Sequence, residues 1–234
     1  MVLWSKVDKP PQGPRGGLSY ERIAVAGVEL ADADGLDAVS MRKVAARLEA
    51  GTMSLYRYVE SRDDLVELMV DHVYGEAVIA ERTGDWRADF GQAARRSRRA
   101  ALAHPWLAGY AAARTTLGPN LLRVVDSTLG LLDGYGLHID QMLDVWMTVQ
   151  AFVQGYVLSE LGEREAQRRT GLSEEEWRRR VGPWVRKVIA SGRYPRVARV
   201  VLEAEDFPDA DAVFERRLGY VLDGLAHLMQ PGAS

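Results

Sequence analysis

The sequence predicts an all-α protein with a small N-terminal helical domain and a larger helical domain after it. Apolar residues recur at the i, i+3, i+4, i+7 spacing of amphipathic helices along most of the chain. Residues that cap helices stand before several of these segments, and no segment shows the alternation of polar and apolar residues that is typical of a β-strand. We expect an arm over residues 1–17, a first domain over 18–63 and a second domain over 64–230.

Composition and charge are those of an ordinary globular protein. Of the 234 residues, 47% are hydrophobic and 27% are charged, a balance that suits a buried core. No apolar run approaches the roughly 18 residues that span a bilayer, and the N-terminus lacks the order of a secretory signal. The chain has no cysteine, which suits a reducing compartment. We therefore expect a cytoplasmic protein without membrane contact.

The first 17 residues predict a flexible basic arm. Prolines and glycines that resist regular structure alternate there with basic residues: Pro10, Pro11, Gly13, Pro14, Gly16, Gly17, Lys6, Lys9 and Arg15. A first helix is expected from Leu18, with an apolar face of Ile23, Ala26, Gly27 and Leu30. Gly35 supplies a left-handed stop for this helix.

Three further helices are expected before residue 82. Ser40 can cap the second helix, whose apolar face is Met41, Val44, Ala45 and Leu48. A brief third helix over Thr52 to Val59 has Leu55 and Val59 as its core pair. Ser61 can cap the fourth helix, which we expect to reach about Glu81 and which carries Asp63 and Asp64 in its first turn.

The second and third of these helices form the pattern of a helix-turn-helix motif. From Ser40 to Arg62 there are five basic residues against two acidic ones, although the whole chain carries a net charge of −3. Positive charge beside a short exposed helix suits binding to the phosphates and base edges of a DNA major groove. A plain helical bundle with solvated charges is the alternative interpretation.

Seven residues of this stretch are candidate DNA contacts. They are Arg42, Thr52, Met53, Ser54, Tyr56, Tyr58 and Arg62. The hydroxyl groups of Thr52, Ser54 and Tyr58 can bond to bases or phosphates, and the other side chains suit thymine methyl groups, guanine or phosphate oxygens.

The quoted motifs also carry a resemblance to a known family. Residues 35–48 read GLDAVSMRKVAARL and residues 54–65 read SLYRYVESRDDL, and both resemble the DNA-binding domain of the TetR family of bacterial repressors. The match runs roughly from Leu18 to Asp71. It implies a homodimeric transcriptional regulator that a small molecule releases from a palindromic operator. It also implies the seven contacts above, with Ser40 as capping residue.

Two positions depart from the usual pattern of the family. Glu49 stands where the family often has glycine at the start of the turn, so the turn can differ in shape. Tyr58 stands where histidine is more frequent, which changes the donors and acceptors offered to DNA.

Helices continue through the second domain. We expect them over residues 86–103, 107–113, 118–135, 140–161 and 209–229. A charged stretch over 162–170 should interrupt the series. Ser173 and Glu176 fit a capping box for a further helix, which Pro183 should end or kink unless it begins a new one.

The second domain more weakly resembles the ligand-binding domain of the tetracycline-repressor branch. The resemblance runs through 102–105 (LAHP), 136–143 (GLHIDQML) and 152–160 (FVQGYVLSE). The stretch after His104 lacks the histidine that coordinates a magnesium–drug complex in that branch, so we expect no such complex, no metal and no cofactor. Aromatic and polar residues instead suit a small organic ligand. The candidates are Trp106, Tyr110, Arg114, Trp146, Gln150, Phe152 and Tyr156.

Each of these sets has a simpler explanation. Met142, Trp146, Val149, Val153 and Tyr156 share one helical face, which also suits a core or a dimer interface. The final helix has an apolar face suited to a symmetric second copy, and a face buried within the chain is the alternative. This face consists of Phe214, Leu218, Val221, Leu222 and Leu225.

Other function classes find little support. The four histidines are scattered, and neither a His-Glu-x-x-His motif, a P-loop nor a Gly-x-Ser-x-Gly motif occurs. We therefore expect no enzyme. The rival hypothesis is a dimeric small-molecule-binding protein without a role in DNA regulation.

Overall fold

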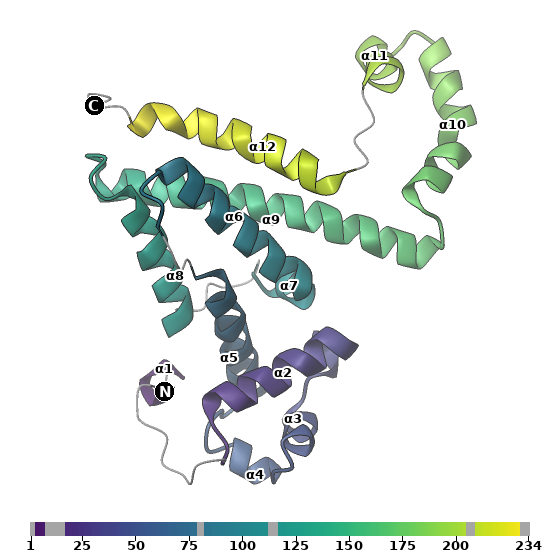
Figure 1. Ribbon diagram of the computed structural model, residues 1–234. Coiled ribbons are helices and arrows are strands. Elements are labelled where there is room, and N and C mark those ends of the chain that lie inside the picture. The colour runs from purple at the N-terminus through teal and green to yellow at the C-terminus, as the bar shows by residue number, and fades with distance from the viewer. Residues whose placement is uncertain (1–2, 8–16, 79–81, 112–116, 205–208, 230–234) are drawn as a thin grey trace. The chain divides into compact units, whose positions relative to one another are not determined.

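The computed structural model is helical throughout the residues that it describes, which are 3–7, 17–78, 82–111, 117–204 and 209–229, and these contain no strand (Figure 1). The α-helices are α1 (Trp4–Val7), α2 (Tyr20–Asp34), α3 (Met41–Arg47), α4 (Thr52–Leu55), α5 (Arg62–Tyr74), α6 (Trp86–Ala103), α7 (Trp106–Ala111), α8 (Pro119–Leu129), α9 (Ile139–Thr170), α10 (Glu174–Ala190), α11 (Pro195–Glu203) and α12 (Ala210–Leu225). Short 3-10 helices cover η1 (Leu36–Ala38), η2 (Gly75–Ala77), η3 (Gly130–Leu132) and η4 (Ala226–Met229). The predicted all-α class is confirmed.

The chain forms two compact units. The first comprises residues 1–157 and 221–234, and the second comprises residues 158–220. The helices α9 and α12 each contribute residues to both units. The predicted domain boundary between residues 63 and 64 falls inside α5. The predicted division into an arm and two domains stays a prediction.

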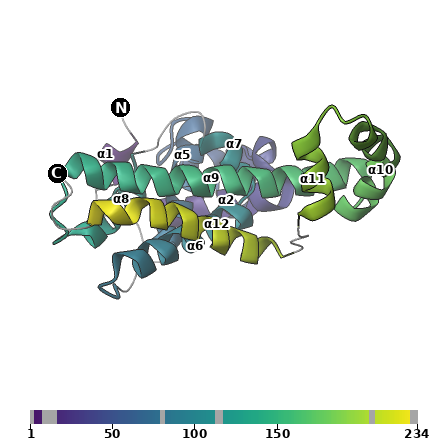
Figure 2. The ribbon, with the colours of Figure 1, turned by 90° about the horizontal axis from the view of Figure 1, so that it is seen from above.

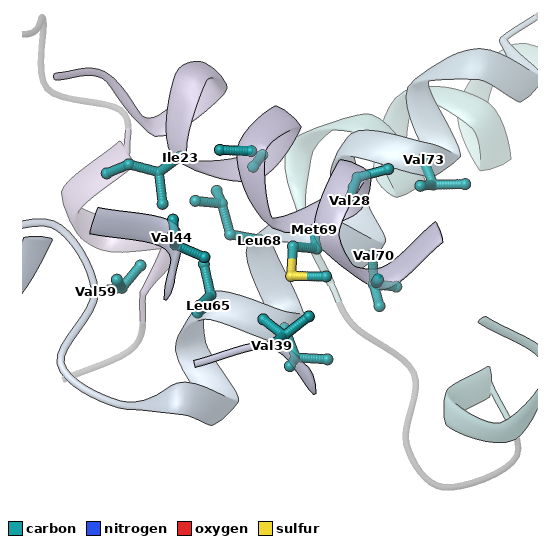
Figure 3. Close-up of a cluster of buried hydrophobic side chains, with 14 of the residues drawn as sticks. Ile23, Val28, Val39, Val44, Val59, Leu65, Leu68, Met69, Val70 and Val73 are labelled. Carbon is teal, nitrogen blue, oxygen red and sulfur yellow. The ribbon is translucent and has the colours of Figure 1, made fainter. Parts of the chain in front are cut away.

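The helices α2 to α5 form what we call the head, residues 17–74, around one apolar core (Figure 3). The side chains of Ile23, Val44, Val59 and Leu65 reach this core from different elements, and each is fully buried. The α5 helix packs extensively against α2, and its buried residues belong to the same core as those of α2, α3 and α4.

Capping residues fix the beginnings of these helices as predicted. The Oγ of Ser40 accepts a hydrogen bond from the backbone N–H of Lys43 at 3.3 Å, and the Oγ of Ser61 accepts one from Asp64 at 3.0 Å. Each bond satisfies a donor that the first helical turn leaves without a partner. Gly35 follows α2 with a φ of 83°, in the left-handed region that favours glycine.

Two predicted helix ends in the head were wrong. The α4 helix ends at Leu55 instead of Val59, because residues 56–58 form a turn in which Tyr58 N–H bonds to the carbonyl of Leu55 at 2.8 Å. The α5 helix ends at Tyr74 and continues only as η2 to Ala77. Residues 79–81 of the predicted extension lie outside the described residues.

The predicted flexible arm does not describe residues 3–7. These residues contain the short helix α1, and Leu3 is buried in the core of the head. The indole N–H of Trp4 donates to Glu67 Oε1 at 3.0 Å, which ties α1 to α5. The contacts of the apolar residues Leu3 and Trp4 with the head order this segment, although prolines and glycines follow it. Residues 8–16, which carry most of the predicted arm, lie outside the described residues.

The remaining helices of the first unit pack beside α5. The α6 helix matches its predicted range of 86–103, and it contacts η2 and η3. The α8 helix contacts α5 and η2, and it ends earlier than predicted because η3 replaces its last turn.

The α9 helix is longer than predicted. It continues through residues 162–170, where we expected an interruption. Side chains one turn apart support this segment, because Arg168 pairs with Glu165 and the amide of Gln167 donates to Glu163. Its fully buried residues form one row of valines at every fourth position: Val145, Val149, Val153 and Val157.

The second unit contains α10 and α11, which lie beside each other (Figure 2). The predicted capping box at Ser173 and Glu176 is present, and α10 runs through Pro183 without ending there. The α11 helix was not predicted. Neither α10 nor α11 contains a fully buried residue.

The apolar face predicted on the last helix is largely buried within the single chain. Phe214 is 0% exposed, Leu218 is 1% exposed and Leu222 is 4% exposed. These three side chains are therefore unavailable to a second copy, and the alternative interpretation of this face is correct for them.

Candidate nucleic-acid interface and ligand-binding region

The α4 segment has polar and apolar side chains on its exposed side, and buried apolar side chains hold its other side in the core. Leu55 and Val59 are both 0% exposed, as the predicted core pair requires. On the opposite side Met53 is 77% exposed and Tyr56 is 42% exposed. Thr52 and Ser54 are half-buried beside them.

Basic side chains surround this surface. Arg42, Lys43 and Arg57 are exposed, and none of their side chains has a hydrogen-bond or ion-pair partner among the described residues. Arg47 differs, because its Nε lies 2.7 Å from Glu29 Oε2 in an exposed ion pair between α3 and α2. Lys43 and Arg57 were counted only as charge in the sequence, although the structure gives them the same freedom as Arg42.

Tyr58 has a structural contact. Its hydroxyl donates to the backbone carbonyl of Leu18 at 2.8 Å, and its ring meets Tyr20 edge to face at 5.2 Å. The hydroxyl proton is therefore already used in joining the α4–α5 turn to the start of α2. This geometry favours a positioning role over the base contact expected from the sequence.

Arg62 is also occupied by the head itself. Its Nε donates to the carbonyl of Val39 at 3.0 Å and its Nη2 donates to the carbonyl of Leu36 at 2.7 Å. These bonds hold η1 and the start of α3 against the start of α5. Arg62 has further N–H groups that can bind a phosphate. The two hydrogen bonds that it makes stabilise the helix-turn-helix geometry.

The turn between α3 and α4 explains the departure at Glu49. Glu49 has a φ of 52°, in the left-handed region. Ala50 N–H bonds to the carbonyl of Ala45 at 2.9 Å and Glu49 N–H bonds to that of Ala46 at 3.2 Å, which is the Schellman pattern of a helix end. The turn keeps the shape for which glycine is favoured, although a glutamate occupies it.

A buried carboxylate joins the head to α8. Asp71 on α5 is 2% exposed, and its Oδ1 accepts hydrogen bonds from the backbone N–H groups of Asn120 at 3.1 Å and Leu121 at 3.0 Å. Burial raises the pKa of Asp71 above its ordinary value, although these hydrogen bonds act in the opposite direction. A methyl group on Gly118 would overlap the Asp71 carboxylate, so only glycine allows α8 to begin there.

One candidate ligand-binding residue on α9 has an unsatisfied polar group. The Nε1 of Trp146 is buried and has no hydrogen-bond partner among the described residues. Phe152 and Tyr156 are half-buried, with ring centroids 5.9 Å apart, and Gln150 is half-buried nearby along the helix. Arg98 of α6, which the sequence did not single out, lies over the Tyr156 ring at 5.5 Å.

The other three ligand candidates are differently placed. Trp106 packs into the core of the head, and its indole N–H donates to Asp32 Oδ1 at 2.8 Å. It therefore contacts the head, and its predicted role in ligand binding stays a prediction. The backbone of Tyr110 lies in α7, whereas its side chain and all of Arg114 lie outside the described residues.

No group of metal-ligating side chains gathers among the described residues. None of their helices is long and apolar enough to cross a membrane. An open cleft of about 440 Å³ lies at the head between α1, α2, α5 and α8, and none of the predicted ligand residues lines it.

The α3 helix, the tight turn after it and the exposed α4 helix form the arrangement of a helix-turn-helix DNA-binding protein. Residues 23–69 match the family model described as bacterial regulatory proteins, tetR family. Residues 78–229 match the model described as tetracyclin repressor-like, C-terminal domain. The chain belongs to the TetR family of transcriptional regulators.

Known transcriptional repressors are similar in sequence to almost the whole chain. The chain is 38% identical to the HTH-type transcriptional repressor DrrR1 of Streptomyces coeruleorubidus over 97% of its own length and 84% of that protein. It is 27% identical to the class A tetracycline repressor of transposon 1721 from Escherichia coli, over 89% of this chain and 91% of that one.

Solved structures show the same architecture. ActR of Streptomyces coelicolor in complex with actinorhodin superposes with a TM-score of 0.72 at 28% identity, covering 93% of this chain and 99% of ActR. Together with the relatives, this identifies the chain as a ligand-responsive DNA-binding transcriptional regulator.

Proposed function

We propose that the chain is a homodimeric repressor that binds a palindromic operator and that a small organic ligand releases. The observation that carries this proposal is the exposed α4 surface between three unpaired cations. A surface of this kind can enter a major groove while the cations neutralise flanking phosphates.

The DNA contacts divide into three roles. Thr52, Met53 and Ser54 read base edges, since Met53 is exposed on α4 and the half-buried Thr52 and Ser54 lie beside it. Tyr56 and the cations Arg42, Lys43 and Arg57 bind phosphates, and Ser40 can still donate its hydroxyl proton to one. Tyr58 and Arg62 hold the reading surface in place.

The ligand is an aromatic molecule that carries a hydrogen-bond acceptor. A buried indole N–H without a partner costs free energy, which an acceptor on the ligand would recover at Trp146. The Phe152 and Tyr156 rings offer stacking surfaces, and the family relationship to ActR, whose solved complex contains actinorhodin, supports the binding of a ligand.

The second copy covers an exposed apolar row on α9. Ile139 is 56% exposed, Leu143 is 39% exposed and Met147 is 55% exposed, at every fourth position along one side of the helix. Such a row is costly to leave in water and suits a symmetric helix pair.

DNA binding is tested with the full-length chain and duplexes from its own promoter region. The association constant should fall steeply between about 50 and 200 mM salt, because binding releases counterions from phosphates. Arg42→Ala and Tyr56→Ala should weaken binding, whereas Arg196→Ala on α11 should not. An affinity that salt does not alter, or equal effects of all three substitutions, would contradict the proposal.

A further inference from the structure

The junction between α6 and α7 carries a buried histidine that contacts two carboxylates. His104 ends α6, where its backbone N–H bonds to the carbonyl of Ala100 at 3.0 Å, and the residue is 8% exposed. Its Nδ1 lies 2.8 Å from Asp32 Oδ1, and its Nε2 lies 3.2 Å from Glu76 Oε1. One imidazole thus joins three segments: the end of α6, the last turn of α2 and η2.

The chemistry of this bridge requires two donors on the ring. Ionised carboxylates only accept hydrogen bonds, and an uncharged imidazole carries a single N–H. Both contacts are therefore donor–acceptor pairs only when His104 is an imidazolium ion. In that state two charge-assisted bonds act on a side chain that is almost fully removed from water.

Asp32 has a position that its own helix does not favour. It lies in the last turn of α2, where the helix dipole is unfavourable to a negative charge. Compensation comes from His104 and from the indole N–H of Trp106, which donates to the same Oδ1 at 2.8 Å. The carboxylate of Asp32 therefore contacts two side chains, His104 and Trp106, that lie about 70 residues further along the chain.

This bridge gives the head a second connection to the helices that follow it. The α5 helix already connects them through the chain itself and through Asp71. The His104 bridge reaches a different helix of the head, α2, and Trp106 and Leu107 pack into the core beside it. A contact to α2 in addition to those of α5 restricts rotation of the head about α5.

We propose that His104 is a positioning residue that sets the orientation of the head for operator binding through its bridge to Asp32 and Glu76. This inference rests on the proposed function, because orientation matters only if two heads must meet one palindrome. Recognition helices must then lie about 34–36 Å apart to enter successive major grooves. Binding of one head to phosphates at random positions has no such requirement.

The experiment uses the full-length chain and two duplexes. One is the palindrome that the wild-type protein selects from a random-sequence library, and the other is a scrambled duplex of the same length. His104→Gln replaces the imidazole, whose two nitrogens contact two carboxylates, with an amide that has a single donor nitrogen. We expect its affinity for the palindrome to fall about tenfold, within the usual range of coupling between sites. Its affinity for the scrambled duplex should change less than about twofold, since phosphate binding needs no register.

Two further variants separate positioning from general damage. Asp32→Asn removes the carboxylate charge from the same bridge, so the double variant should lose little more affinity than His104→Gln alone. His138→Gln is the matched control, because His138 pairs with Asp140 at 3.1 Å on an exposed surface, and it should bind both duplexes as the wild type does.

The possible outcomes discriminate clearly. A folded His104→Gln protein with wild-type affinity for the palindrome would overturn the positioning role, as would an equal loss on both duplexes together with a lowered melting temperature. Failure of the wild-type protein to select any palindrome would instead overturn the proposed function, and the positioning role with it.

Discussion

Asp71 is a buried carboxylate whose environment favours its protonated form. The carboxylate accepts backbone hydrogen bonds from the first turn of α8, but removal from water has the larger effect and raises its pKa. Burial likewise raises the pKa of the neighbouring Tyr74 hydroxyl, with the charge of Asp71 as a smaller cause. The contact between α5 and α8 is therefore sensitive to protonation.

The pH dependence of stability should report this carboxylate. Because its pKa is raised on folding, the folded chain holds the proton more tightly than the unfolded chain does. The free energy of unfolding should therefore fall as pH rises from the ordinary value of 3.8 through the raised value. Asp71→Asn removes this titration, so the stability of the wild type relative to the variant should decrease over that interval. Urea unfolding at a series of pH values measures it, and a difference that is independent of pH would contradict it.

Residues such as Tyr58 and Arg62 mark the limit of reading a motif from sequence. Their positions beside α4 suggest DNA contacts, and nothing local indicates otherwise. Their hydrogen-bond acceptors are carbonyls of Leu18, Leu36 and Val39, which are at least 23 residues away along the chain. A side chain whose partner is a distant backbone group leaves no periodic signal in the sequence.

Helix beginnings were more predictable than helix ends. A serine cap followed by an apolar pattern specifies a beginning locally, as at Ser40, Ser61 and Ser173. The continuation of α9 through its charged segment was missed because the loss of apolar residues was taken as the end of the helix, although charged residues are also good helix formers. Whether they continue a helix depends on pairs such as Arg168 with Glu165, which were not weighed against the loss of apolar residues.

The α10 helix contains a proline that weakens it. Pro183 cannot donate a backbone hydrogen bond to the preceding turn, and its ring crowds that turn. Pro183→Ala should stabilise α10 by as much as about 3 kcal/mol, since this is the usual difference between the two residues inside a helix. Hydrogen exchange over residues 174–190 should slow accordingly.

Gly182 supplies a matched control for this substitution. Gly182→Ala should gain only about 1 kcal/mol, because glycine differs less from alanine than proline does. Its new methyl group would meet only the end of Arg186 at 3.4 Å. Equal slowing of exchange in the two variants would show that the proline does not limit this helix.

At the scale of the whole molecule, the exposed row on α9 predicts the assembly. Met147→Glu places a charge at the C-terminal end of this row, where a second copy should exclude water. We expect the mass measured by light scattering to fall from about twice 26.0 kDa toward that of one chain. Leu122→Glu on α8 changes a side chain that is similarly exposed, at 53%, and it should leave the mass unchanged. A Met147→Glu protein that keeps the wild-type mass would contradict this interface.

The core of the head also determines when it can be completed during synthesis. Besides residues of α2 to α5 it contains Ala100, Trp106 and Leu107, which follow the end of α5 by about 30 residues. At about 5–20 residues per second, a ribosome needs a few seconds to add them. A nascent chain that ends at α5 therefore contains the α4 surface but lacks three residues of the core beneath it. The core of the head can be completed only after part of α6 and α7 has been synthesised.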